Sequence, residues 1–195
     1  MDSRTQVEAP GCGGWGRSPQ EKGWVGGHPF MIDIHESFAV PSDPRTVWQV
    51  ISDPEAVVGC VPGASLGEQQ EDGSLDATVA VRFGPVKVTF HGRVTLDLDD
   101  ASMVGHVAAR GRDNQGGTRV TSTMTFAVKD QAESGSTVAI DGEVEISGKL
   151  AGLIESGASI VVNRMSNEFA DKLARRCAGA TAAAPREPGE TEGRD

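Results

Sequence analysis

The stretch TVAIDGEVEISGKLAGLIESG, residues 137–157, changes from the periodicity of a strand to that of a helix. Over residues 138–146 apolar side chains occupy alternate positions with mostly acidic residues between them, the pattern of a strand with one buried face. Over residues 150–173 the apolar positions recur at the spacing of one helix face. A strand therefore ends the strand-rich part of the chain, and one long helix closes it. This order favours a curved sheet with a helix laid across it, an arrangement that can enclose an apolar pocket.

The segment before this junction consists mainly of alternating patterns separated by turn residues. Ser42 is a suitable N-cap for a helix over 43–52, and Asp53-Pro54 precedes a second short helix over 55–59. Because most strands follow one another without an intervening helix, we expect an α+β fold of sequential antiparallel hairpins rather than a βαβ repeat. The alternation predicts strands at 32–40, 66–71, 75–83, 86–98, 103–112, 118–129 and 138–146.

The two ends of the chain lack any periodic pattern. Residues 1–30 are crowded with Gly and Pro, and residues 178–195 are rich in Ala, Pro and charge. Such segments bury too little apolar surface to offset the entropy of ordering. We therefore expect a disordered N-terminal extension, one domain over 31–177 and a disordered C-terminal tail. Met31 opens the first patterned segment, and we hypothesise that it is the functional start.

The composition excludes several classes of protein. A formal net charge of −10 argues against nucleic-acid binding, because phosphate contacts require clustered Lys and Arg. Three cysteines without metal-like spacing predict neither a disulfide framework nor a zinc site, and they fit a reducing cytoplasm. No apolar run approaches the roughly 18 residues needed to cross a bilayer, and no secretory signal is present. We expect a cytoplasmic protein whose membrane contact, if any, is peripheral.

The sequence shows no catalytic or metal-binding pattern. Phosphate-loop, dinucleotide-binding, nucleophile-elbow and zincin motifs are absent, and so is tyrosine. His35, His91 and His106 are in phase with polar residues of their strands, so we expect them to face solvent, while His28 falls in the N-terminal extension. The acidic residues over 97–100 fall at an expected hairpin turn, where solvation explains them. No catalytic residue and no metal ligand is assigned.

Two polar residues share the phase of apolar neighbours on their strands. Glu36 is expected to point inward or toward a strand end, and Ser122 to place its hydroxyl on the inner face. A buried polar group needs a partner. Ser122 therefore contacts either a ligand carbonyl or a neighbouring strand or trapped water.

The predicted long helix carries several small residues, among them Gly152, Gly157, Ala158 and Ser159. Glycine inside a helix costs about 1 kcal/mol relative to alanine. Two interpretations remain open, namely close packing against the sheet or empty space beneath the helix. Space would form an elongated cavity for an apolar ligand. The candidate ligand-binding residues are then Val79, Val81, Phe90, Val120, Ser122, Met124, Ile140, Val144, Gly157, Val161 and Met165.

Three groups of residues along this plan carry a family resemblance. They are Asp53-Pro54 followed by CVPGA at 60–64, FGP at 83–85 leading into FHG at 90–92, and ISGKLA at 146–151. With these motifs in this order, residues 31–177 resemble the carbon monoxide dehydrogenase G-subunit (CoxG) family. That family belongs to the SRPBCC or START-like superfamily, which also includes polyketide cyclases and lipid-transfer proteins.

The resemblance implies a helix-grip fold, in which a curved antiparallel sheet of about seven strands grips the C-terminal helix over a hydrophobic cavity. It further implies a non-catalytic accessory protein of a molybdenum hydroxylase of the carbon monoxide dehydrogenase type. Such a protein works at the cytoplasmic membrane face and hands electrons to a respiratory quinone such as menaquinone, a lipophilic molecule bound in the cavity without a covalent bond. The chain departs from this pattern in its tail, which is short, Ala/Pro-rich and acidic where membrane-anchoring members carry an apolar or amphipathic extension.

Two alternatives use the same fold. One is a polyketide cyclase or dehydrase, for which Glu36 is the inward acid or base that the pattern offers. The other is an assembly factor without a ligand, which docks through its surface and has a filled core.

Overall fold

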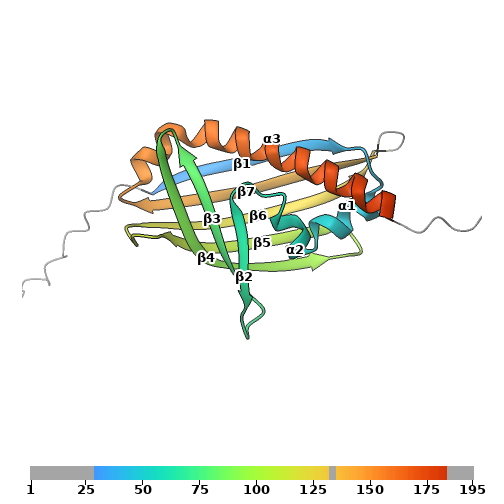
Figure 1. Ribbon diagram of the computed structural model, residues 1–195, viewed down its shortest axis with the longest axis horizontal. Coiled ribbons are helices and arrows are strands. Elements are labelled where there is room, and N and C mark those ends of the chain that lie inside the picture. Colours follow the sequence, from blue (N-terminus) through green and yellow to red (C-terminus); the bar gives the residue numbers. More distant parts are fainter. Residues whose placement is uncertain (1–28, 132–134, 184–195) are drawn as a thin grey trace, which may run out of the picture.

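A computed structural model describes residues 29–131 and 135–183 of the chain (Figure 1). It contains one antiparallel sheet, two short helices after the first strand, and one long C-terminal helix. The elements are β1 (Phe30–Val40), α1 (Pro44–Ile51), α2 (Pro54–Val58), β2 (Ala64–Gln69), β3 (Leu75–Phe83), β4 (Val86–Asp99), β5 (Val104–Asp113), β6 (Thr118–Asp130), β7 (Ser136–Gly148) and α3 (Ala151–Ala183).

The seven strands pair in the order β1-β7-β6-β5-β4-β3-β2, and every pair is antiparallel. Each strand from β2 to β7 therefore lies beside its sequence neighbour, as the predicted hairpins require, and β1 joins the sheet beside β7. Figure 1 shows β2, β3 and the first part of β4 turned steeply against β5, β6 and β7, with α3 lying across the sheet. The predicted α+β architecture of a curved sheet and one long helix is confirmed.

A pair of glycines allows neighbouring strands to approach where β4 turns. Gly92 of β4 lies opposite Gly111 of β5. A side chain at Gly92 would place its Cβ 2.2 Å from the carbonyl oxygen of Arg110, a distance that no real contact allows. Glycine within a strand commonly marks such a bend or close backbone approach. The bend carries β3 and β2 around toward α3.

Two apolar clusters hold the sheet and α3 together at opposite ends of the helix. One contains Leu173 and Cys177 of α3 with residues of α1, β1, β6 and β7, and Trp48 packs on Phe126 with a ring-centroid distance of 5.7 Å. The other contains Ala151 and Ile154 of α3 with residues of β3, β4 and β7. Between these clusters the central turns of α3 face the sheet.

The first cluster contains two buried cysteines. Cys60 and Cys177 form no disulfide. Burial raises the pKa of Cys177 to about 11, because the thiolate would be charged in an apolar environment.

Several element boundaries differ from the predicted ones. Asp43 rather than Ser42 caps α1, since its carboxylate accepts hydrogen bonds from the backbone nitrogens of Arg45 (3.1 Å) and Thr46 (3.0 Å). Proline at the first helical position favours this start. β2 begins at Ala64 and ends at Gln69, earlier than the predicted 66–71.

The last helix also extends past the domain boundary predicted at 177. Helix α3 continues to Ala183, through residues that the composition assigns to a disordered tail. Alanine is the best helix former, so this Ala-rich segment extends a helix that tertiary packing has already nucleated. The predictions for residues 1–28 and 184–195 lie outside the described residues.

We predict that Leu173→Ala lowers the free energy of unfolding by about 2–5 kcal/mol, because the leucine is fully buried and truncation leaves a cavity. Urea denaturation measures this change. Ile160→Ala on the same helix is the control, since Ile160 is 73% exposed and its truncation should change stability by less than about 0.5 kcal/mol. Equal losses in the two variants would contradict the assignment of Leu173 to the core.

Candidate functional site

A cavity of about 510 Å³ lies between α3 and the inner face of the sheet. Its walls come from all seven strands, from α2 and the turn after it, and from the central turns of α3. The lining is almost wholly aliphatic and aromatic. Ligand sites commonly combine this volume and apolar lining with a few polar groups. We take this cavity as the candidate site.

The residues predicted from strand and helix phase meet in this cavity, with one exception. Those that line it are Val79, Val81, Phe90, Val120, Ser122, Met124, Ile140, Val144, Val161 and Met165. Gly157 is not among the residues that line it. A Cβ at Gly157 would lie 3.4 Å from the ring of Phe83, which places the glycine against β3. Phe83 therefore lies near Gly157, and open space lies beneath Val161 and Met165.

One wall of the cavity is not predicted by the phase of the sequence. It comes from α2 and β2 and the turn between them, through Val57, Val61, Pro62 and Leu66 among others. The short helix and weak strand have no clear periodicity, so their inward residues cannot be assigned. The turn residues at 60–64 carry a family motif, but the motif does not by itself indicate which of them face inward. The first strand also contributes, with Ile32 and Ile34 in the phase that the alternation indicates.

Polar side chains are few on the inner surfaces. Glu36 lies opposite Ile140 in the β1–β7 pair, and Ser122 lies opposite Val144 in the β6–β7 pair. Both are half-buried and both line the cavity, as does Ser166 of α3. Within residues 29–131 and 135–183 neither Glu36 nor Ser122 has a side-chain hydrogen bond or ion pair. Their hydrogen-bonding capacity is therefore available to a ligand or to water.

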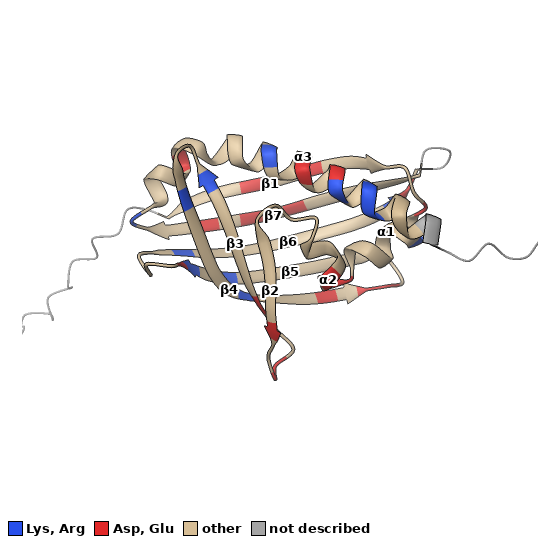
Figure 2. Ribbon diagram, in the orientation of Figure 1, with Lys and Arg blue, Asp and Glu red and all other residues tan. Residues whose placement is uncertain are grey.

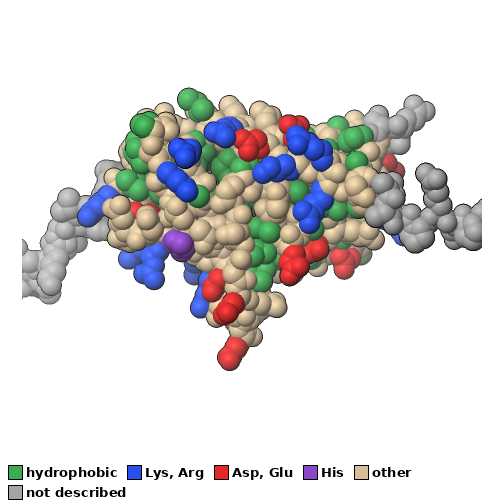
Figure 3. Space-filling model, in the orientation of Figure 1, with side chains coloured by type: hydrophobic (Ala, Val, Ile, Leu, Met, Phe, Trp, Pro, Cys, Tyr) green, Lys and Arg blue, Asp and Glu red, His purple; other side chains and the backbone are tan. Residues whose placement is uncertain are grey.

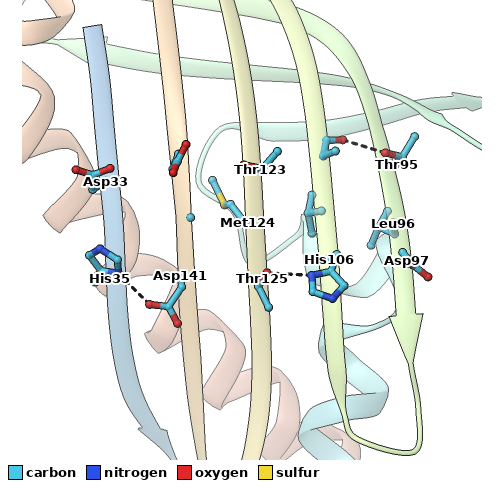
Figure 4. Close-up of a pocket in the computed structure, with 14 residues that line it drawn as sticks. Asp33, His35, Thr95, Leu96, Asp97, His106, Thr123, Met124, Thr125 and Asp141 are labelled. Carbon is cyan, nitrogen blue, oxygen red and sulfur yellow. Dashed lines mark hydrogen bonds and ion pairs between the residues drawn. The ribbon is translucent and has the colours of Figure 1, made fainter.

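A second hollow of about 670 Å³ lies on the outer face of the sheet and crosses the five neighbouring strands β1, β7, β6, β5 and β4 (Figure 4). His35 Nδ1 lies 2.9 Å from Asp141 Oδ1, and His106 Nδ1 lies 2.9 Å from the hydroxyl of Thr125. The side chains of His35 and Asp141 are 73% and 67% exposed. The outward orientation predicted for these histidines is confirmed. This hollow is an open surface that cannot shield an apolar ligand from water.

Charge on the sheet is divided between its two halves. Figure 2 marks Lys and Arg positions near one end of β4, β5 and β6, and Asp and Glu positions along β1 and β7. The carboxylate of Asp141 on β7 accepts a hydrogen bond from the His35 ring, and this raises the pKa of His35 above its ordinary value of 6.5. Neither face shows metal chemistry: among the described residues no group of three His, Cys, Asp or Glu is placed to bind a metal. In the same part of the chain no helix has the length and apolar character to span a bilayer.

An antiparallel sheet that curves around a C-terminal helix over an apolar cavity is the helix-grip arrangement. Residues 37–178 match the model of the carbon monoxide dehydrogenase G-subunit (CoxG) family. The chain belongs to the CoxG family. The resemblance carried by the motifs at 53–64, 83–92 and 146–151 is thereby confirmed. No protein with a curated description matches the chain.

Solved structures share this fold at low sequence identity. A conserved protein from Geobacillus kaustophilus is 17% identical with a TM-score of 0.66, over 76% of this chain and 97% of that one. The Zhui aromatase/cyclase from Streptomyces is 17% identical with a TM-score of 0.56, over 80% and 98%. Norcoclaurine synthase from Thalictrum flavum is 18% identical with a TM-score of 0.51, over 79% and 98%. These similarities confirm the helix-grip fold of the CoxG-family chain.

We predict that Asp141→Asn lowers the pKa of His35 toward its ordinary value, because the variant removes the carboxylate that favours the imidazolium. Histidine ring resonances followed by NMR through a pH titration measure this shift. With a folded-state pKa above the unfolded one, the pair stabilises the fold below about pH 6.5 and loses this effect as pH rises through the folded pKa. Thr125→Val is the control and should leave the His35 titration unchanged. An unaltered His35 pKa in Asp141→Asn would contradict the assignment.

Proposed function

We propose that this CoxG-family protein is a non-catalytic carrier of a lipophilic molecule, a respiratory quinone such as menaquinone. In this role it links a carbon monoxide dehydrogenase-type molybdenum hydroxylase to the electron-transport chain of the membrane. The observation that carries the proposal is the apolar cavity of about 510 Å³ beneath α3. Membership of the family supports the enzyme partner.

The cavity is suited to an isoprenoid or aromatic ligand. Each Å² of apolar surface removed from water contributes about 25 cal/mol, so a hydrophobic ligand gains affinity without specific polar contacts. Aromatic and thioether side chains, such as Phe90, Phe126 and Met124, line the space. Such groups pack well against flat rings and flexible chains. A cavity of this kind argues against the alternative of an assembly factor with a filled core.

Exposed apolar side chains near one end of α3 support transient contact with the cytoplasmic membrane face. Leu153 and Ile160 are 37% and 73% exposed and lie seven positions apart, on one side of the helix. Val86, 39% exposed, belongs to the β3–β4 hairpin, which packs on the start of α3. Figure 3 shows hydrophobic side chains at the surface over this end of the helix. Lys87 and Arg82 in the hairpin supply the positive charge that anionic lipids attract.

We predict that Met124→Trp and Val161→Trp abolish quinone binding, because each indole fills the cavity that the ligand would occupy. Thermal shift with menaquinone-4 in mild detergent measures binding, and overpacking should cost about 1–3 kcal/mol of stability. Asn167→Trp on the exposed side of α3 is the control and should bind as wild type does.

Native mass spectrometry and lipid extraction of the purified protein identify the resident molecule. A cavity that is repeatedly found empty, together with no quinone-dependent thermal shift in the wild type, would reject the carrier function.

A cyclase or dehydrase is a second candidate, favoured by the carboxyl group of Glu36, which lines the cavity and has no side-chain partner among the described residues. Helix-grip structures that resemble this chain include an aromatase/cyclase. If the protein turns over a polyketide-like substrate, Glu36→Gln should lower the rate by about 10²-fold or more, the typical contribution of general acid–base catalysis. Unchanged turnover in this variant would dismiss Glu36 as the catalytic group.

A further inference from the structure

We propose that Glu36 forms a head-group subsite that selects ligands whose polar end donates a hydrogen bond over ligands whose polar end only accepts one. This proposal rests on the proposed function, because the subsite specifies the orientation and chemical class of the molecule held in the cavity. For a quinone carrier, it means that the reduced form, which carries hydroxyl groups, binds more tightly than the oxidised form.

The position of the subsite follows from a contact between β1 and α3. The rings of Phe38 and Phe169 meet edge to face with centroids 5.9 Å apart. β1 and α3 run in the same direction in Figure 1. Glu36 precedes Phe38 by two residues on the same strand face, and Ser166 precedes Phe169 by three on the same helix face. Both therefore lie on the same side of this ring contact, and both line the cavity.

The chemistry of the subsite follows from what surrounds Glu36. An ionised carboxylate can only accept hydrogen bonds. Its neighbours in phase on β1 are Ile34 and Phe38, and its partner on β7 is Ile140. None of these side chains can donate a hydrogen bond. No cation of the described residues pairs with it. Arg93 and Arg110 also border the cavity, but their exposed side chains are out of phase with its lining, and Arg93 lies 3.5 Å from Asp76.

A ligand hydroxyl can donate a hydrogen bond to the Glu36 carboxylate. A carbonyl, ester or ether cannot, and its oxygen lone pairs repel those of the carboxylate. A hydrogen bond to a charged group is worth more than one between neutral groups. Ser122, which also lines the cavity from the sheet, does not discriminate in this way, because a hydroxyl both donates and accepts. Glu36 and Ser122 lie on strands separated by β7 and at different levels, since Glu36 is opposite Ile140 and Ser122 is opposite Val144.

A matched pair of probes tests the subsite. 4-Nonylphenol and its methyl ether have the same apolar body, but only the phenol donates a hydrogen bond. Isothermal titration calorimetry of the full chain should give about tenfold tighter binding for the phenol. Glu36→Leu should remove this preference and leave binding of the ether as strong or stronger. Ser122→Ala is the matched control within the cavity and should keep the preference.

The outcomes separate the subsite from the carrier function. Equal binding of both probes to the wild type overturns the subsite while cavity binding stands. Binding of neither probe overturns cavity binding, and the subsite with it. Loss of the preference in Ser122→Ala, with retention in Glu36→Leu, places the polar end at Ser122 and overturns the subsite at Glu36. Glu36→Gln provides a second variant of nearly the same shape, and its neutral amide should give an intermediate preference.

Discussion

The close approach of β4 and β5 at Gly92 and Gly111 is the constraint on which the rest of the structure depends. Any side chain at Gly92 would collide with the backbone of Arg110, so this crossing excludes every residue that has a Cβ. The bend of β4 turns β3 and β2 out of the plane of the remaining strands. The curvature of the sheet leaves the cavity of about 510 Å³ between its inner face and α3. The enclosed space is therefore a property of the backbone path before it is a property of the lining residues.

The lining residues then decide what the space can hold. Strand alternation directs mainly aliphatic and aromatic side chains into the cavity, and most charged side chains outward to solvent. The two ends of α3 are packed against well-filled clusters, whereas its centre is not. Affinity for a ligand thus comes mainly from apolar area, and selectivity comes from the few polar groups that interrupt it. This division agrees with the proposed carrier function.

Much of this arrangement is predictable from the sequence, because period-two alternation assigns both a strand and the direction of its side chains. The inward residues of β3, β6 and β7, and Val161 and Met165 of α3, follow from phase alone. Phase does not say how far apart the helix and the sheet lie. It therefore cannot decide whether Gly157 contacts the sheet or lines the cavity. It is also weak in short elements, which is why the wall from α2 and β2 escapes prediction. The end of α3 is mispredicted because an Ala-rich segment has helix propensity but no amphipathic pattern.

The two ends of helix α3 are packed in separate clusters, and the cavity lies beneath its middle. Its packed ends around Ile154 and Leu173 belong to different clusters. The turns between them face the cavity. A segment supported in this way can rise and settle as a unit while both packed ends stay folded. Entry and release of an apolar ligand would then require only a local opening of the helix on the microsecond to second scale, rather than unfolding of the domain.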